Sequence, residues 1–485
     1  MVTSKDAYGI TGFGGYIPRL RMERSAIAAA HQWMAPSLRA LGKGRRAFCS
    51  WDEDSATMAV EAARDALPAG VASTVGRLLF ASTSMPFADL QNAAIVAGAL
   101  GLRHDIQTLD IGQSQRAGTS ALMAAFRDAS APALLVASDR PRGKPASTQE
   151  ISFGAGAAAF TLGSQGVIAT LQGSASSTAL FVDHFRSDGK YDYYWEERWI
   201  RDEGYLKIVP VAVKAALADA GIEAGTVKHF ILPTAFKGVA AALGRKLGLA
   251  SGVEAAALEE DCGFCGSAHG LVMLAQVLET AASGDVILLV GFGQGCDALV
   301  LRVTDAIAGF KPRRGVSGAL ADGQAHADYL RLLSYDDGIE LEWGMRSEKS
   351  VKTAFTEQYR SSHQLGGFMA GKCGKCGTFQ FPQLPYCANP ECGAPQSGFV
   401  PVSLADVPAK VLTYTADWLS YHPSPPLYVG FVQFENGARV LLEMADVSAR
   451  GVDTGVPLRA VFRIKDVDKV RGYPRYFWKM TPIQA

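Results

Sequence analysis

The sequence predicts an α/β protein of two similar halves, followed by a cysteine-ligated metal site and a small all-β barrel. Three observations predict this architecture. Apolar strands alternate with amphipathic helices over the first 305 residues, the same order of elements recurs about 150 residues later, and four cysteines gather between residues 373 and 392. With 485 residues, of which 48% are hydrophobic and 19% charged, the chain is long enough for several folded domains.

The repeat can be followed element by element. A strand at 7–17 ends in glycines and is followed by a helix at 57–67 and a strand at 77–83. The later counterparts of this helix and strand are a helix at 210–220 and a strand at 228–234. Three further pairs match: 92–102 with 239–249, the helix from Gly118 with the helix from Gly266, and the glycine-rich strand 154–163 with 293–303. Two such copies predict two buried sheets packed around shared helices.

Residues 104–122, HDIQTLDIGQSQRAGTSAL, join an apolar strand to a helix, and the polar cluster Gln113 to Arg116 lies at the helix start. Backbone N–H groups and the positive end of the helix dipole face outward at such a point. We therefore expect the chemistry of the protein at this turn. Gln115 can donate a hydrogen bond to a substrate oxygen there, or serve only as a capping polar residue.

The segment after the repeat carries mixed charge and weak helical periodicity, so residues 306–365 are expected to form a connecting arm of one or two helices. It leads to four cysteines in two pairs on turns: Cys373, Cys376, Cys387 and Cys392. Four thiolates with this spacing favour a closed, tetrahedral, structural Zn²⁺ site.

The last 80 residues alternate short apolar runs with turns, and the Asn436–Gly437 turn between two runs predicts a hairpin. Five such strands fit an OB-fold barrel. A barrel of this kind beside a zinc ribbon can bind nucleic acid, but residues 401–485 hold ten Lys and Arg against eight Asp and Glu, and the whole chain has no net charge. Nucleic acid is therefore not an expected partner.

The N-terminus has no apolar signal-peptide core, and no stretch is long and apolar enough to span a bilayer. We expect a cytoplasmic protein with no membrane partner. The eight cysteines are too few for a disulfide scaffold in a chain of this length.

The residues now support a resemblance. YGITGFGGYIPRLRM, SWDEDSATMAVEAARDAL, QRAGTSAL, FGAGAAAF and GFGQGCDALVL resemble the 3-hydroxy-3-methylglutaryl-CoA synthase and ketoacyl-ACP synthase III branch of the thiolase superfamily. The tail resembles the zinc-ribbon and OB-fold modules that accompany thiolase-like proteins, often as separate subunits. The resemblance implies a duplicated, five-layer thiolase-like α/β fold, a coenzyme A thioester or β-keto acid as substrate, and a homodimer. The expected domains are two thiolase-like halves, a helical linker, a zinc ribbon and an OB-fold, at 1–170, 171–305, 306–365, 366–400 and 401–485.

The members of this family use a Cys nucleophile at a helix start, with His, Asn and Glu groups around it. The corresponding positions here carry Gln115, Ile231, Phe264 and Thr83. The resemblance therefore implies either a site rebuilt for chemistry without a covalent acyl-enzyme or a site that has lost its activity.

Other residues can supply the missing groups. Cys265 and His269 lie four apart at the start of the second-half helix and can face one way, or Cys265 is a small apolar filler. Asp183 and His184 can act as a general acid or base, or belong to a structural loop or dimer contact. Arg140, Arg142, Lys144, Lys237 and Arg186 are candidates for contacts with CoA, and solvated loop charges are the alternative.

We expect an acyl-CoA-dependent enzyme that cleaves or transfers at a β-keto or β-hydroxy acyl group, by retro-Claisen, retro-aldol or acyl-transfer chemistry, without the usual Cys. Two alternatives stay open. One is a non-catalytic acyl-CoA-binding scaffold, and the other is a condensing synthase that uses Cys265.

Overall fold

The computed structural model describes residues 8–68, 71–187, 191–346 and 352–483. They form two compact units. The first unit consists of Met1–Ser50, Asp54–Ala94 and Arg103–Ile339, and the second of Trp51–Glu53, Ile95–Leu102 and Glu340–Ala485. Within the described ranges, no helix has the length and apolar character that crossing a membrane requires.

The two halves of the repeat each contribute strands to the first unit. The larger strands are β1 (Gly9–Tyr16), β4 (Arg77–Ala81), β5 (Gln107–Ile111), β6 (Ala133–Asp139), β7 (Gly156–Gly163), β8 (Ala169–Thr178), β11 (His229–Ile231), β12 (Val286–Phe292) and β13 (Gly295–Val303). Hydrogen bonds connect them in the order β11-β12-β13-β8-β1-β7-β6-β4-β5. The halves join where β1 pairs antiparallel with β8, through Gly9 with Thr170 and Ile10 with Ala169. The sequence pattern did not predict this connection between the two expected sheets.

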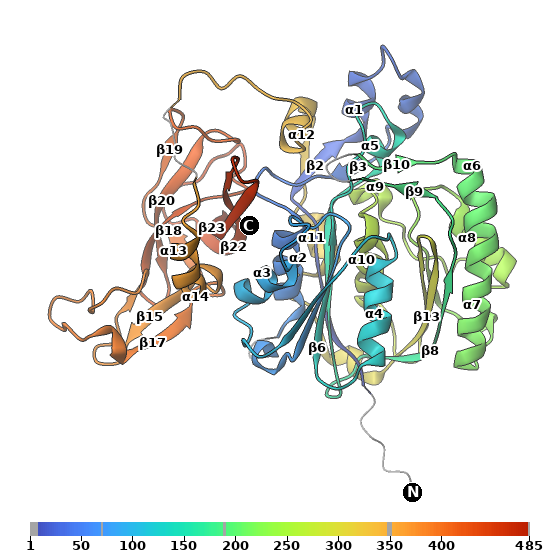
Figure 1. The fold of residues 1–485 in the computed structure, drawn as a ribbon, viewed down its shortest axis with the longest axis horizontal. Helices are drawn as coiled ribbons and strands as arrows, with labels where there is room; N and C mark the ends of the chain where they lie inside the picture. Colours follow the sequence, from blue (N-terminus) through green and yellow to red (C-terminus); the bar gives the residue numbers. More distant parts are fainter. Residues whose placement is uncertain (1–7, 69–70, 188–190, 347–351, 484–485) are drawn as a thin grey trace, which may run out of the picture. The chain divides into compact units, whose positions relative to one another are not determined.

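Helices alternate with these strands and form layers. The helices of the first unit that cover the sheets are α2 (Ser55–Ala66), α4 (Ala117–Arg127), α7 (Leu206–Ala220), α8 (Val239–Leu247), α10 (His269–Leu278) and α11 (Gly315–Ala321). In Figure 1, α4 and α10 lie between the strands of the two halves, α7 and α8 cover one outer face, and α2 and α11 cover the other. The five-layer thiolase-like arrangement is thereby confirmed.

The central layer is apolar because α4 and α10 are buried between two sheets. One core cluster joins Ala121 and Leu122 of α4, Leu271 and Leu274 of α10, and strand residues of both halves. Gly118 lies where α4 meets the second half, and a Cβ there would lie 2.5 Å from the carbonyl oxygen of Ser267. A larger residue at this position would push the two helix starts apart.

Smaller elements complete the first unit. A three-stranded sheet contains β2 (Leu20–Glu23), β3 (Arg45–Ala47) and β14 (Gln324–His326), and β9 (His184–Phe185) pairs with β10 (Tyr193–Tyr194). The short helices that begin in this unit are α1 (Arg24–Ala30), α3 (Asn92–Ala99), α5 (Thr148–Ser152), α6 (Glu197–Trp199), α9 (Glu259–Cys262) and α12 (Tyr329–Tyr335).

The second unit contains the cysteine cluster and a mostly antiparallel β structure. Its helices are α13 (Phe355–Arg360) and α14 (Ser362–Gly366); β15 (Met369–Cys373), β16 (Phe379–Gln380) and β17 (Phe399–Ser403) form one sheet. A six-stranded sheet follows, with β18 (Ala409–Val411), β19 (Thr415–Asp417), β20 (Leu427–Phe434), β21 (Arg439–Glu443), β22 (Pro457–Asp468) and β23 (Tyr473–Pro482). The expected hairpin at Asn436–Gly437 is confirmed between β20 and β21.

Two expectations about this region need adjustment. In the described part of 306–365, the helical segments are α11, α12, α13 and most of α14, rather than one or two helices. The last 80 residues, described as far as residue 483, contain six strands rather than five, since β18 and β19 are separate, with the carbonyl of Thr413 between them close to Gly430 of β20. Residues 347–351 of the expected arm lie outside the described residues. The OB-fold topology and the five domain boundaries stay predictions.

Candidate functional site

The helix start at Gln115 is fixed by contacts to the other half of the repeat. Ser114 Oγ and Arg116 Nε both donate to the carbonyl oxygen of Gly293, each at 3.0 Å. Arg116 also forms an ion pair with the buried Asp297, with Nη1 and Oδ1 2.7 Å apart. A Cβ on Gly293 would lie 3.1 Å from the Gln115 backbone nitrogen, so the close approach requires glycine. The turn before the helix is therefore held rigidly in place.

The Gln115 side chain does not cap the helix. The N-cap residue of α4 is Arg116, and Gln115 Nε2 donates instead to the hydroxyl of Tyr194 on β10. Burial raises the pKa of Tyr194 well above its ordinary value, so the hydroxyl stays protonated. The Gln115 amide keeps a second N–H, and the Tyr194 hydroxyl keeps its own hydrogen, as donors for a bound molecule.

Asp183 and His184 form a buried pair beside this hydroxyl. His184 Nδ1 and Asp183 Oδ2 are 2.9 Å apart, and their side chains are 10% and 5% exposed. Gln294 Nε2 donates to the other oxygen, Asp183 Oδ1, at 2.6 Å. The His184 ring stacks on Tyr194 with centroids 5.1 Å apart. The structure thus brings together Gln115, Asp183 and His184, which come from distant parts of the sequence.

A second carboxylate lies at the end of β6. Asp139 is fully buried, and its Oδ2 accepts hydrogen bonds from Thr83 Oγ1 at 2.7 Å and from Ser267 Oγ at 2.8 Å. Thr83 occupies the position that corresponds to the acid of the resembled family. Arg186 bonds the Thr83 carbonyl and pairs with Asp192. Sequence reasoning missed Asp139 and Gln294, and the only sequence signal for either was its place at the end of a strand.

The apolar replacements are deeply buried. Ile231 is fully buried and Phe264 is 3% exposed, in ring contact with Phe153. His229, two residues before Ile231, is a partly exposed partner of Asp285, with Nε2 and Oδ2 3.1 Å apart. The side chains of Ile231 and Phe264 therefore supply no acid or base.

Cys265 and His269 are neighbours, as expected, but both are engaged by backbone groups. The Cys265 N–H donates to His269 Nδ1 at 3.2 Å, so His269 Nε2 carries the hydrogen and donates to the Ala257 carbonyl at 2.7 Å. Contact with the Cys262 thiol and burial raise the pKa of Cys265 well above that of an ordinary thiol. This geometry favours a neutral imidazole and a protonated thiol.

The buried His269 predicts a pH-dependent stability. Burial lowers its pKa from 6.5 to about 4, whereas in the unfolded chain it titrates near 6.5. Because the unfolded state binds the proton first, stability is full above pH 6.5 and falls by up to about 3 kcal/mol as the pH drops to 4. Urea unfolding at pH 7 and pH 4.5 measures the loss. It should shrink in His269→Gln and persist in the control His104→Gln, which changes an exposed histidine. An equal loss in all three proteins would contradict this attribution.

The five cationic candidates for CoA contacts have different surroundings. Arg186 and Arg142 pair with Asp192 and Asp337, each with N–O distances of 3.3 Å. Arg140 lies beside several acids, among which Asp336 and Asp54 raise its pKa. Lys144 and Lys237 are exposed.

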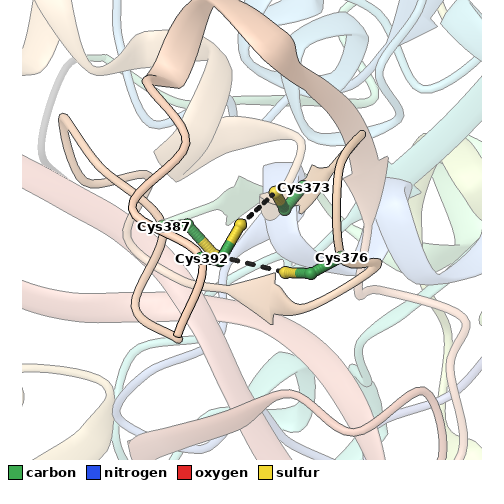
Figure 2. Close-up of side chains that lie close together, drawn as sticks. All are labelled: Cys373, Cys376, Cys387 and Cys392. Carbon is green, nitrogen blue, oxygen red and sulfur yellow. Dashed lines mark hydrogen bonds between the residues drawn. The ribbon is translucent and has the colours of Figure 1, made fainter. Parts of the chain in front are cut away.

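The four cysteines of the second unit converge as the sequence predicted. All four sulfur atoms lie within 4.8 Å of one another. Cys373 and Cys392 have sulfurs 3.7 Å apart, and Cys376 and Cys387 have sulfurs 3.5 Å apart, as Figure 2 shows. A tetrahedron with Zn–S bonds of about 2.3 Å has edges of about 3.8 Å, so the cluster fits Zn²⁺. The cluster is a structural zinc site, since all four positions belong to the protein.

We expect one zinc per chain in the purified protein and close to none in Cys387→Ser, because three thiolates no longer close the site. Elemental analysis by mass spectrometry checks this. Cys49→Ser, which removes a buried cysteine outside the cluster, is the matched control and should retain the metal. Equal zinc in both variants would rule out the four-cysteine site.

Comparisons with known proteins give a matching family model, related sequences and similar solved structures. Residues 364–397 match the family described as ChsH2, rubredoxin-like zinc ribbon domain. The chain is 31% identical over 320 residues to the hydroxymethylglutaryl-CoA synthase of Aeropyrum pernix, which covers 64% of this chain and 89% of that protein. It is 30% identical to the enzyme of the same name from Archaeoglobus fulgidus, over 67% of this chain and 98% of that one. A solved structure of HMG-CoA synthase complexed with CoA superposes with a TM-score of 0.58 at 16% identity, covering 72% of this chain and 95% of that one.

Proposed function

Since the chain belongs to the hydroxymethylglutaryl-CoA synthase family, we propose that it is an enzyme acting on CoA thioesters of β-keto or β-hydroxy acids. It would cleave or transfer at the acyl group without a Cys nucleophile. The observation that carries the proposal is the buried Asp183–His184 pair beside the Gln115–Tyr194 hydrogen bond. This pair supplies an imidazole for proton transfer, and the amide and hydroxyl supply donors for a developing negative oxygen.

Retro-aldol cleavage suits this set of groups because it needs no nucleophile. His184 Nε2 takes the proton of the β-hydroxyl, the oxygen lone pair forms a carbonyl, and the bond between Cα and Cβ breaks. Its electrons pass to the thioester as an enolate, whose oxygen the Gln115 amide stabilises. The imidazolium then returns the proton to Cα, which leaves a ketone or aldehyde and a shorter acyl-CoA. Retro-Claisen cleavage requires in addition a water or thiol nucleophile.

Lys144 and Lys237 are the favoured contacts for the CoA phosphates, because they are exposed cations. Arg142 and Arg186 already neutralise carboxylates of this chain.

One observation favours a non-catalytic acyl-CoA-binding scaffold: the family's His and Asn positions hold the buried apolar residues Ile231 and Phe264. The condensing synthase through Cys265 draws less support, since its thiol is protonated and His269 is held by two backbone groups.

Incubation of the full chain with β-hydroxyacyl-CoA and β-ketoacyl-CoA thioesters, followed by mass spectrometry, tests the proposal. We expect a carbonyl product and a shorter acyl-CoA, and turnover reduced in Gln115→Ala. CoA binding without turnover would support the scaffold instead. A covalent acyl adduct that vanishes in Cys265→Ser would establish the synthase.

The proposal includes a homodimer formed through β5. This strand ends the nine-strand order, and most of its residues are exposed, including Leu109 at 40%. A strand at the edge of a sheet can pair with a further strand, and here that strand would replace the Gln91 side chain, which donates to the Thr108 carbonyl. Light scattering should give about twice the chain mass of 51.5 kDa, and Leu109→Lys should lower it toward the monomer. A monomeric wild-type protein would refute this part.

A further inference from the structure

We propose that Gln294 is a positioning residue for the Asp183–His184 pair, and that it determines which imidazole nitrogen of His184 carries the hydrogen. The inference deepens the proposed function and rests on it for its catalytic meaning. Gln294 lies in the turn between β12 and β13, 111 residues away from Asp183 in the sequence.

The backbone of Gln294 is unusual. Its φ is 48°, in the left-handed region that side chains with a Cβ rarely occupy, and it is flanked by Gly293 and Gly295. A glycine at the same position would adopt this conformation at no steric cost. A glutamine held there costs free energy relative to glycine, and an interaction of its side chain can offset that cost.

That interaction is the 2.6 Å hydrogen bond from Gln294 Nε2 to Asp183 Oδ1. Asp183 is 3% exposed, so its carboxylate relies on donors from the protein. With Oδ1 held by the amide, Oδ2 is directed to His184 Nδ1 at 2.9 Å. The carboxylate thus has one donor on each oxygen and cannot rotate without losing one of them.

The position of the hydrogen on the His184 ring follows from its contact with the Asp183 carboxylate. Asp183 Oδ2 is an acceptor, so a neutral His184 carries its hydrogen on Nδ1 and leaves Nε2 as the basic nitrogen. Nε2 is the atom that the proposed proton transfer requires.

The turn that contains Gln294 also contacts the helix start at Gln115. The Gly293 carbonyl accepts from Ser114 and Arg116, which flank Gln115, and Gln115 reaches Tyr194, on which His184 stacks. The contacts form a closed ring from Gln294 through Asp183, His184, Tyr194 and Gln115 back to Gly293. One turn therefore fixes the distance between the base and the oxygen-stabilising amide.

Gln294→Gly is the decisive variant, because it keeps or relaxes the backbone and removes only the amide. Ala146→Gly is its matched control, because Ala146 also has a left-handed φ, of 68°, and glycine relaxes the backbone there without removing a polar side chain. If Gln294 served only the turn, both variants would behave alike.

The full chain labelled with ¹⁵N-histidine reports the tautomer of each imidazole by NMR, and His184→Gln identifies the His184 signals. We expect the Nδ1–H form in the wild type and in Ala146→Gly, and a rise of the Nε2–H form in Gln294→Gly. Turnover should fall about 10- to 100-fold in Gln294→Gly with little change in KM, since the base is misplaced rather than the substrate.

An unchanged His184 tautomer in Gln294→Gly would overturn the inference, whatever the activity. A tautomer change in a protein that turns over no thioester would uphold the positioning role and refute the proposed function. The two failures are thereby distinguishable.

Discussion

His184→Gln is expected to lower turnover by roughly 10²–10⁴-fold, the usual contribution of a positioned general base, with KM for the thioester nearly unchanged. Glutamine can still bond Asp183, so the variant loses proton transfer rather than packing. Steady-state kinetics on the substrate identified by mass spectrometry measures the effect.

His229→Gln is the matched control. His229 also pairs with an aspartate in the first unit, Asp285, at 3.1 Å, but it is 27% exposed and belongs to no part of the proposed site. A loss below about fivefold in His184→Gln, or an equal loss in both variants, would remove His184 from the mechanism.

Arg463→Ala is expected to destabilise the second unit by about 3–5 kcal/mol. Arg463 is fully buried, and its Nη2 lies 3.1 Å from Glu53 Oε1 and 3.0 Å from Asp446 Oδ2. Both carboxylates are also buried, so removal of the guanidinium leaves two buried negative charges without this cation. The corresponding fall in transition temperature is on the order of 10 °C for a unit of this size.

Calorimetry of the full chain measures this transition. Arg471→Ala is the control: its Nη1 is 2.7 Å from the buried Asp468, but its own side chain is 47% exposed, and Asp468 keeps the hydrogen bond from the Thr353 N–H at 3.1 Å, so the loss of stability should be smaller. Adding Glu53→Gln and Asp446→Asn to Arg463→Met should recover much of the stability, because the buried charges are then gone. Equal effects of Arg463→Ala and Arg471→Ala would contradict this assignment of the buried charges.

The parts of the fold that the sequence predicted depend on local patterns. The alternation of strands and helices, the four zinc ligands and the Asn436–Gly437 hairpin each follow from residues a few positions apart. The same holds for the helix start at Gln115, where a strand, a turn and a helix succeed one another within 20 residues.

What the sequence did not predict depends on contacts between distant residues. Gln294 and Asp183 meet across 111 positions, and Thr83 and Asp139 across 56. A glutamine in a glycine-rich turn gives no sign that its amide is directed at a carboxylate. The spacing of Cys265 and His269 correctly predicted that the two residues are neighbours. It gave no information on the Cys265 N–H and the Ala257 carbonyl, which occupy the two imidazole nitrogens of His269.

The second unit is discontinuous, and this affects the order in which the chain can fold during synthesis. Trp51–Glu53 and Ile95–Leu102 belong with Glu340–Ala485, which the ribosome makes last. Asp52 lies 427 residues before Lys479, and Glu53 lies about 410 before Arg463, so at 5–20 residues per second these acids wait on the order of 20–85 s for their partners. During that interval Asp52 cannot pair with Lys479, and Glu53 cannot pair with Arg463. A chain that stops before residue 340 would leave both acids permanently without these partners.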